Sequence, residues 1–100
     1  MVTKRNNQYK IRMEEVELKD GTAPGRAIEF EFGNHDDIFA ILESGRVNRH
    51  FSSPSDGTEF LVGLKLFSEV MLRDKDNPLF GEFRPAFLNF MKKLKGDRPK

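Results

Sequence analysis

Residues 59–73 read EFLVGLKLFSEVMLR, and this stretch decides how the other elements have to be arranged. Apolar side chains occupy nine of the thirteen positions from Phe60 to Leu72 and extend well beyond one helical face. A helix that is apolar around most of its circumference has to be covered on more than one side. We therefore expect a central buried helix here, with Phe67 in the core and Gly63 where another element approaches closely.

Two runs in the N-terminal third alternate apolar and charged residues, which is the period of a strand with one solvated face. Between them, Asp20–Gly21 and Pro24–Gly25 favour turns, so the runs predict an antiparallel hairpin with a long loop. The doubled acid Glu14–Glu15 marks either a β-bulge or the end of the first strand. The apolar members are Tyr9, Ile11 and Met13 in the first run, and Ile28, Phe30 and Phe32, which should face the central helix, in the second.

A short helix is expected after the hairpin. Asn34 is a good N-cap residue, and Gly45 is a plausible C-cap about ten residues further on. Asp36 and Asp37 would then lie in the first turn, where the helix dipole favours negative charge. The polar segment 46–55 is expected to be a loop.

The two helices that follow have recognisable starts. Asp56 and Glu59 have the spacing of a capping box, so the central helix is expected to begin there. Asn77–Pro78 combines a cap with a first-turn proline and predicts the start of a last helix. A kink is expected at Gly81–Pro85, because the proline ring clashes with the carbonyl four residues earlier. The apolar seam of this helix comprises Phe80, Phe83, Phe87, Phe90 and Leu94.

This order of elements predicts an α+β domain in which an antiparallel β-hairpin is followed by three helices, ββααα. A two-stranded sheet is marginal by itself, so the hairpin is expected to pack on the central buried helix. Residues 8–96 are expected to form a single domain, because 100 residues fit one core. Residues 1–7 are expected to be a flexible basic N-terminus and residues 97–100 a frayed C-terminus.

The composition narrows the chemistry that the chain can perform. It contains no cysteine, which excludes disulfides and thiolate zinc sites. The N-terminal residues form no continuous apolar run of the kind that a secretory signal needs. No segment approaches the roughly 20 apolar residues of a membrane span. We expect a cytoplasmic protein.

Charge is unevenly distributed although the net charge is only +1. The basic side chains are in excess over 1–12 and 77–100, whereas the acidic ones are in excess over 13–45. Basic ends around an acidic middle suit attraction within the chain or between copies better than a duplex-binding face. A dedicated nucleic-acid domain has a larger basic excess, so the charge argues against nucleic acid as a partner, and association through the basic termini is a weaker alternative.

The chain offers one cluster of chemistry-bearing residues, at His35, Asp36 and Asp37, with His50 further along. A histidine beside carboxylates is compatible with a metal or small-ligand site. Adjacent residues at a helix start, however, point in different directions, and capping together with dipole compensation already explains the aspartates. No nucleophile elbow and no phosphate-binding loop occurs. We therefore assign no catalytic residue, no metal ligand and no cofactor.

Several motifs resemble those of a known family, in the same order along the chain. They are residues 32–39 (FGNHDDIF), 62–67 (VGLKLF), 78–80 (PLF), 83–87 (FRPAF) and 90–95 (FMKKLK). Over Tyr9 to Gly96 the chain resembles a family of small uncharacterised bacterial proteins that is known only as a domain of unknown function. The resemblance implies a compact bacterial cytosolic domain and transfers no active site.

For function, the sequence favours a small non-enzymatic bacterial domain for protein–protein interaction or regulation. Missing catalytic sets and open strand edges both point in this direction. The expected interaction patch comprises His35, Asp36 and Arg84, and a homodimer is expected through strand pairing or through surplus apolar surface on the helices. The alternative is a small enzyme or ligand-binding or metal-binding protein that uses His35, Asp36 and Asp37. The sequence leaves the partner unidentified.

Overall fold

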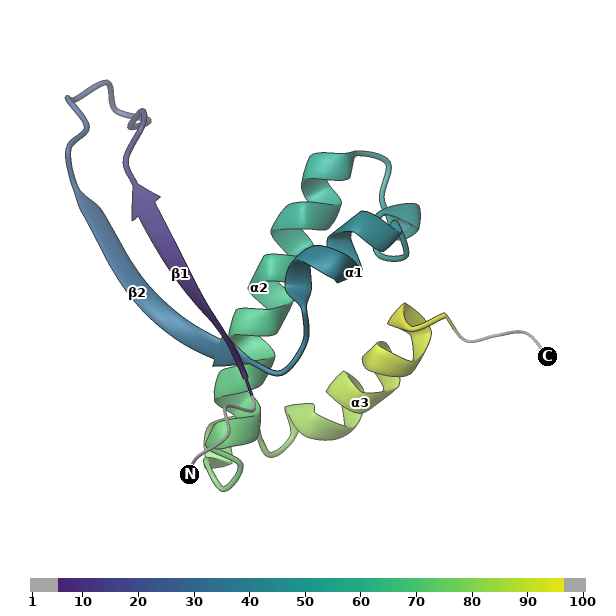
Figure 1. Cartoon of the computed structure of the whole chain (residues 1–100). Helices are drawn as coiled ribbons and strands as arrows, with labels where there is room; N and C mark the ends of the chain where they lie inside the picture. Colours follow the sequence, from purple (N-terminus) through teal and green to yellow (C-terminus); the bar gives the residue numbers. More distant parts are fainter. Residues whose placement is uncertain (1–5, 97–100) are drawn as a thin grey trace, which may run out of the picture. The chain divides into compact units, whose positions relative to one another are not determined.

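The computed structural model describes residues 6–96 and divides the chain into two compact units, Met1–Asp36 and Asp37–Lys100 (Figure 1). The first unit is a hairpin and the second is helical, which confirms the predicted α+β order of two strands and three helices. Packing of the hairpin on the central helix, and a single domain over 8–96, stay predictions. The predictions for residues 1–5 and 97–100 lie outside the described residues, while Asn7 already belongs to the first strand.

The hairpin unit consists of β1 (Asn7–Glu14) and β2 (Ala27–Asn34) in antiparallel register. Directly opposed residues lie on the same face of the sheet, so the register collects the apolar side chains on one face and the charged ones on the other. The sequence left a β-bulge or the end of the strand open after Glu14. The pairing is regular up to Glu14 and Ala27 and leaves no extra residue for a bulge, and β1 ends at Glu14. The apolar pairs are Tyr9 with Phe32, Ile11 with Phe30, and Met13 with Ile28; the charged pairs are Lys10 with Glu31 and Arg12 with Glu29.

The first helix, α1, spans Ile38–Ser44, and its N-cap is Asp37. The predicted cap at Asn34 is wrong, and so is the placement of two aspartates in the first turn. Asn34 completes β2 and accepts a hydrogen bond from the Asp36 backbone N–H (2.9 Å), which turns the chain before the helix begins. Asp37 then accepts the Ala40 N–H at 3.0 Å. Gly45 is confirmed as the C-cap, with a φ of 77°.

The central helix, α2, spans Pro54–Arg73, so the predicted start at a capping box is wrong. Pro54 occupies the first helical position, where its fixed φ suits the helix and its missing N–H costs nothing. Asp56 therefore lies in the first turn instead of capping it. The predicted loop 46–55 contains a 3-10 turn, η1 (Asn48–His50), and both α1 and η1 pack on α2.

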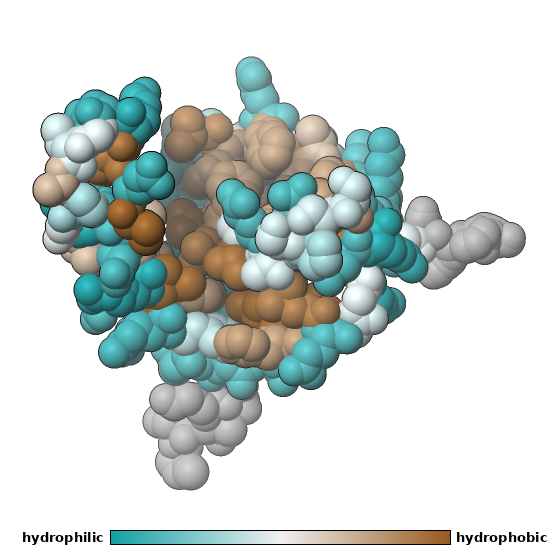
Figure 2. Space-filling model, turned by 90° about the horizontal axis from the view of Figure 1, so that it is seen from above, coloured by the Kyte–Doolittle hydropathy of each residue, from teal (hydrophilic) through white to brown (hydrophobic). Residues whose placement is uncertain are grey.

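The core of the helical unit corrects the assignment of Phe67. Phe67 is 40% exposed, whereas Leu61 and Met71 on the same helix are only 2% and 1% exposed. Its ring contacts other aromatic rings edge-on and is left open on its remaining side. Figure 2 shows apolar side chains, in brown, that reach the surface. The buried apolar residues are Ile38, Val47, Leu61, Met71 and Phe87.

The C-terminal seam is split into two elements, η2 (Pro78–Phe80) and α3 (Phe83–Leu94). Asn77 caps η2 as expected, by accepting the Leu79 N–H at 2.9 Å. The predicted kink at Gly81–Pro85 is wrong, because Pro85 is the third residue of a new helix. In the first turn of a helix, the backbone N–H needs no intrahelical partner, so a proline fits there without bending anything.

Aromatic rings join α3 and η2 to α2. Phe67 lies 5.9, 5.8 and 6.3 Å from the ring centroids of Phe80, Phe83 and Phe87. Nearer the start of α2, Phe60 contacts Phe90 at 5.9 Å. Edge-to-face pairs at such distances are favourable beyond their buried area. Among the described residues, no helix combines the length and the apolar character that crossing a membrane requires.

Candidate interaction site

The structure brings two of the three predicted patch residues together, at the end of the hairpin unit. His35 Nε2 lies 3.4 Å from Asp36 Oδ1, and the imidazole is largely exposed. The Asp36 backbone carbonyl accepts hydrogen bonds from Asn7 Nδ2 (3.1 Å) and from the Tyr9 hydroxyl (2.9 Å). The backbone that carries the pair is therefore held by side chains of β1.

Arg84, the third patch residue, has a structural role within the helical unit. Its Nη2 donates hydrogen bonds to the backbone carbonyls of Met71 (3.4 Å) and Lys75 (2.5 Å). Met71 lies in the last turn of α2 and Lys75 in the turn that follows, so the guanidinium satisfies a carbonyl that lacks an intrahelical donor and complements the helix dipole. Arg84 thus caps the end of α2, and the patch of His35, Asp36 and Arg84 stays a prediction.

The other residues considered for metal or ligand binding also have local partners. Asp37 caps α1, and His50 Nε2 lies 3.2 Å from the Leu94 carbonyl at the end of α3. Within residues 6–96, no three histidine, aspartate or glutamate side chains are grouped so that they could hold a metal ion. The cluster around His35 therefore offers no assembled ligand set in the described structure.

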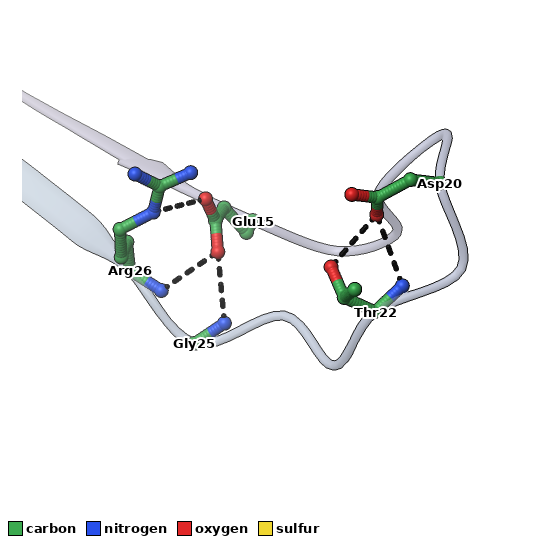
Figure 3. A network of polar contacts seen from close by, with 5 residues as sticks. All are labelled: Glu15, Asp20, Thr22, Gly25 and Arg26. Carbon is green, nitrogen blue, oxygen red and sulfur yellow. Dashed lines mark hydrogen bonds and ion pairs between the residues drawn. The ribbon is translucent and has the colours of Figure 1, made fainter.

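A carboxylate closes the hairpin loop in a way that sequence patterns did not reveal (Figure 3). Glu15 Oε1 accepts the backbone N–H groups of Arg26 and Gly25, each at 3.0 Å, and Oε2 pairs with Arg26 Nε at 2.6 Å. These hydrogen bonds hold the pKa of Glu15 below its ordinary value, and the bond from the Arg26 backbone N–H has the largest effect. Partial desolvation of the carboxylate acts in the opposite direction, and the Gly25 N–H and the Arg26 side chain lower the pKa further. Further out, Asp20 accepts the Thr22 N–H and hydroxyl, which likewise lower its pKa.

We expect Glu15→Gln to loosen this loop at neutral pH, because an amide loses the charge that strengthens all three hydrogen bonds. A lowered folded-state pKa means that the stabilisation is present above the unfolded-state pKa and is lost as the pH falls through the folded-state value. Hydrogen-exchange protection of the Gly25 and Arg26 amides should therefore fall in the variant, and in the wild type under acid. Exposed Glu17→Gln is the matched control. Equal protection in both variants would contradict the assigned role of Glu15.

Along α2, η2 and α3, more large apolar side chains of the helical unit are exposed than are fully buried. Three large apolar side chains of these elements are buried, Leu61, Met71 and Phe87. Seven others are 40% exposed or more, and the most exposed is Leu79 at 76%. Contiguous apolar surface on a folded protein marks sites of interaction. The seven are Phe67, Val70, Leu72, Leu79, Phe83, Leu88 and Phe90.

A shallow hollow of about 500 Å³, here called the Gly63 hollow, lies over the N-terminal half of α2. Its apolar lining comes from Phe51, Phe60 and Leu64, and the carboxylates of Asp56 and Glu59 belong to it as well; Gly63 completes the lining. A Cβ added at Gly63 would meet no atom within 4 Å, so the close approach expected there is not made. Glycine inside a helix costs roughly 0.5–1 kcal/mol relative to alanine. A glycine in the middle of a long apolar helix is therefore the sequence feature that could have indicated the hollow.

The hairpin followed by helices defines a small α+β protein. The chain belongs to the family described as "Domain of Unknown Function with solved-structure structure" (DUF3861), whose model matches residues 7–96. The structure is also similar to a crystal structure of a protein of unknown function from Pectobacterium atrosepticum, with 40% sequence identity and a TM-score of 0.78. That match covers 90% of this chain and 97% of the other. No curated protein matches the chain.

Proposed function

We propose that this chain is a non-enzymatic bacterial domain that acts in the cytoplasm through protein–protein contacts, as an adaptor or a regulatory accessory protein. The observation that carries the proposal is the apolar surface of the helical unit, where seven large side chains of α2, η2 and α3 are 40% exposed or more. Burial of apolar area is the main driving force of association, and exposed apolar patches of a folded protein mark the surfaces that partners cover.

The charge pattern of the hairpin bears on how copies of the chain could meet. Within the described residues, β1 and β2 form a two-stranded sheet with no third strand on either edge. Antiparallel pairing of two β2 strands about Phe30 would oppose Glu29 and Glu31, and pairing of two β1 strands in the same manner would oppose Lys10 and Arg12. Like charges directly opposite are destabilising. The pattern therefore disfavours a homodimer formed by pairing of like strands.

The hairpin edges suit partners of a different composition. Strand addition takes its affinity from backbone hydrogen bonds and its selectivity from alternate side chains. An incoming strand beside β2 would need basic residues opposite Glu29 and Glu31, and one beside β1 would need acidic residues opposite Lys10 and Arg12. The edges thus disfavour pairing of like strands and are open to a strand with complementary charges, which β1 of one copy would offer to β2 of another.

The enzyme or ligand-binding alternative at His35, Asp36 and Asp37 gains no specific support. Asp37 is engaged as a helix cap, and His35 Nε2 and Asp36 Oδ1 lie 3.4 Å apart, which is long for an ion pair. Association with nucleic acid through the termini stays a weaker prediction, since those residues lie at or beyond the limits of the described chain.

The test is capture of partners from a lysate of the native bacterium, with the wild type, Leu79→Asp and Leu72→Asp as baits. The two leucines are 76% and 59% exposed, so the substitutions should leave the fold intact while placing charge on the apolar surface. We expect proteins enriched by the wild type to be lost with either variant and kept with Asn89→Asp, which adds the same charge at an exposed polar position. Identical capture by all baits would overturn the proposal.

A further inference from the structure

We infer that the Gly63 hollow receives α3 of a second copy of this chain, with Leu88 entering the apolar lining and Lys92 meeting Asp56 and Glu59. The inference rests on the proposed function and deepens it, because it names the partner as a second copy and the residues that recognise it.

The hollow is chemically specific. Phe51 and Phe60 pack with ring centroids 5.1 Å apart and give it an aromatic wall, while the open backbone at Gly63 leaves room for an apolar side chain to approach α2 closely. Asp56 and Glu59 are exposed and make no ion pair or side-chain hydrogen bond within the described part of the chain. A fitting occupant is therefore apolar at its centre and basic at one end.

The outward face of α3 has this composition. Leu88, Lys92 and Lys95 recur at spacings of four and three residues and form one stripe, here called the Leu88 stripe. It lies on another side of the helix from Phe87, which is buried, and from Phe90, which contacts Phe60 of its own chain. Leu88 is 60% exposed, and both lysines are exposed.

The spacing and the direction of the two helices also agree. Leu88 and Lys92 are one helical turn apart on α3, and Gly63 and Glu59 are one turn apart on α2, in both cases about 6 Å along the axis. Matching leucine to glycine and lysine to glutamate sets the helices antiparallel. The helix dipoles favour this antiparallel orientation, and the lysines at the C-terminal end of α3 then lie near the carboxylates of Asp56 and Glu59.

Each copy has one hollow and one Leu88 stripe, so a twofold arrangement forms the same contact twice and closes on itself. A heterologous use of the two surfaces would instead propagate into open assemblies. In the closed dimer, both copies of Leu88 are covered and both hollows are filled at the same time.

The experiment is sedimentation equilibrium of the purified full chain, from low to high micromolar concentration, with two charge reversals, Glu59→Lys and Lys92→Glu. We expect the wild type to dimerise, and each variant by itself to have a dissociation constant at least about tenfold higher, because like charges then face each other across the contact. An equimolar mixture of the two variants should dimerise again, since opposite charges then meet at both copies of the contact.

The recovery in the mixture distinguishes a lost contact from a lost fold, because a misfolded variant cannot be rescued by its counterpart. Helical circular dichroism checks each variant directly, and Lys75→Glu, a reversal at an exposed site beyond the other end of α2, should leave dimerisation unchanged. A wild type that stays monomeric at high micromolar concentration overturns this inference but leaves partner capture from lysate intact. Dimerisation unaffected by either reversal, or no recovery in the mixture, also overturns it.

Discussion

Leu61→Ala is expected to lower the free energy of unfolding by about 2–5 kcal/mol. Leu61 is only 2% exposed, so the shortened side chain removes apolar contacts and leaves a cavity in the middle of α2. Urea titration followed by helical circular dichroism measures the loss in the helical unit. The size of the effect follows from burial alone, because no hydrogen bond or charge is changed.

Leu72→Ala is the matched control, since it makes the same substitution on the same helix at a side chain that is 59% exposed. We expect it to cost less than about 1 kcal/mol, as surface substitutions away from special features usually do. Equal losses for the two variants would show that Leu61 is not the buried residue of α2. The comparison also tests the revised core, in which Leu61 and Met71 replace Phe67.

Gly57→Ala and Gly63→Ala are expected to change stability in opposite directions, although both are glycine-to-alanine substitutions in α2. Gly57 is buried, and a Cβ there would overlap Asn48 Oδ1 and lie 3.3 Å from the Asn48 Cα. Overpacking of this kind typically costs about 1–3 kcal/mol. At Gly63 the space is open, so the better helix propensity of alanine should add roughly 0.5–1 kcal/mol.

Thermal unfolding of both variants beside the wild type measures the difference, and each variant is the control of the other. A gain in stability for Gly57→Ala would mean that Asn48 moves away freely. Asn48 Oδ1 is buried without a hydrogen-bond partner within the described residues, so it already lies in a tightly confined place. At a concentration where the chain is monomeric, a loss for Gly63→Ala would show that the hollow is not open in solution.

The two glycines differ in whether the packing of the chain itself requires them. Gly57 is required by the fold, because η1 packs against it. Gly63 has no such reason within the described structure, yet it lowers the helix propensity at the middle of a long helix. A residue that weakens the helix without improving the packing of its own chain is expected where something else approaches.

Patterns among neighbouring residues correctly predicted those strands and helix ends that depend only on nearby residues. Strict alternation predicted both strands, Gly45 ended α1 through its left-handed conformation, and Asn77 capped the turn that follows α2. The predicted caps failed where two residues competed for the same role. Asp37 caps α1 in place of Asn34, and Ser53 stands at the N-cap of α2 in place of Asp56, because a cap also depends on where the preceding element ends.

By itself, the sequence determined the order of elements, the two-faced hairpin and the presence of a long apolar helix, since these follow from periodicity along the chain. Only the tertiary structure decided which apolar residues of that helix are buried. Phe67 and Leu61 are both apolar, but burial depends on which side chains arrive from η1, η2 and α3, and these contacts are not local in sequence. The role of Arg84 at the end of α2 and the open space at Gly63 were decided in the same way.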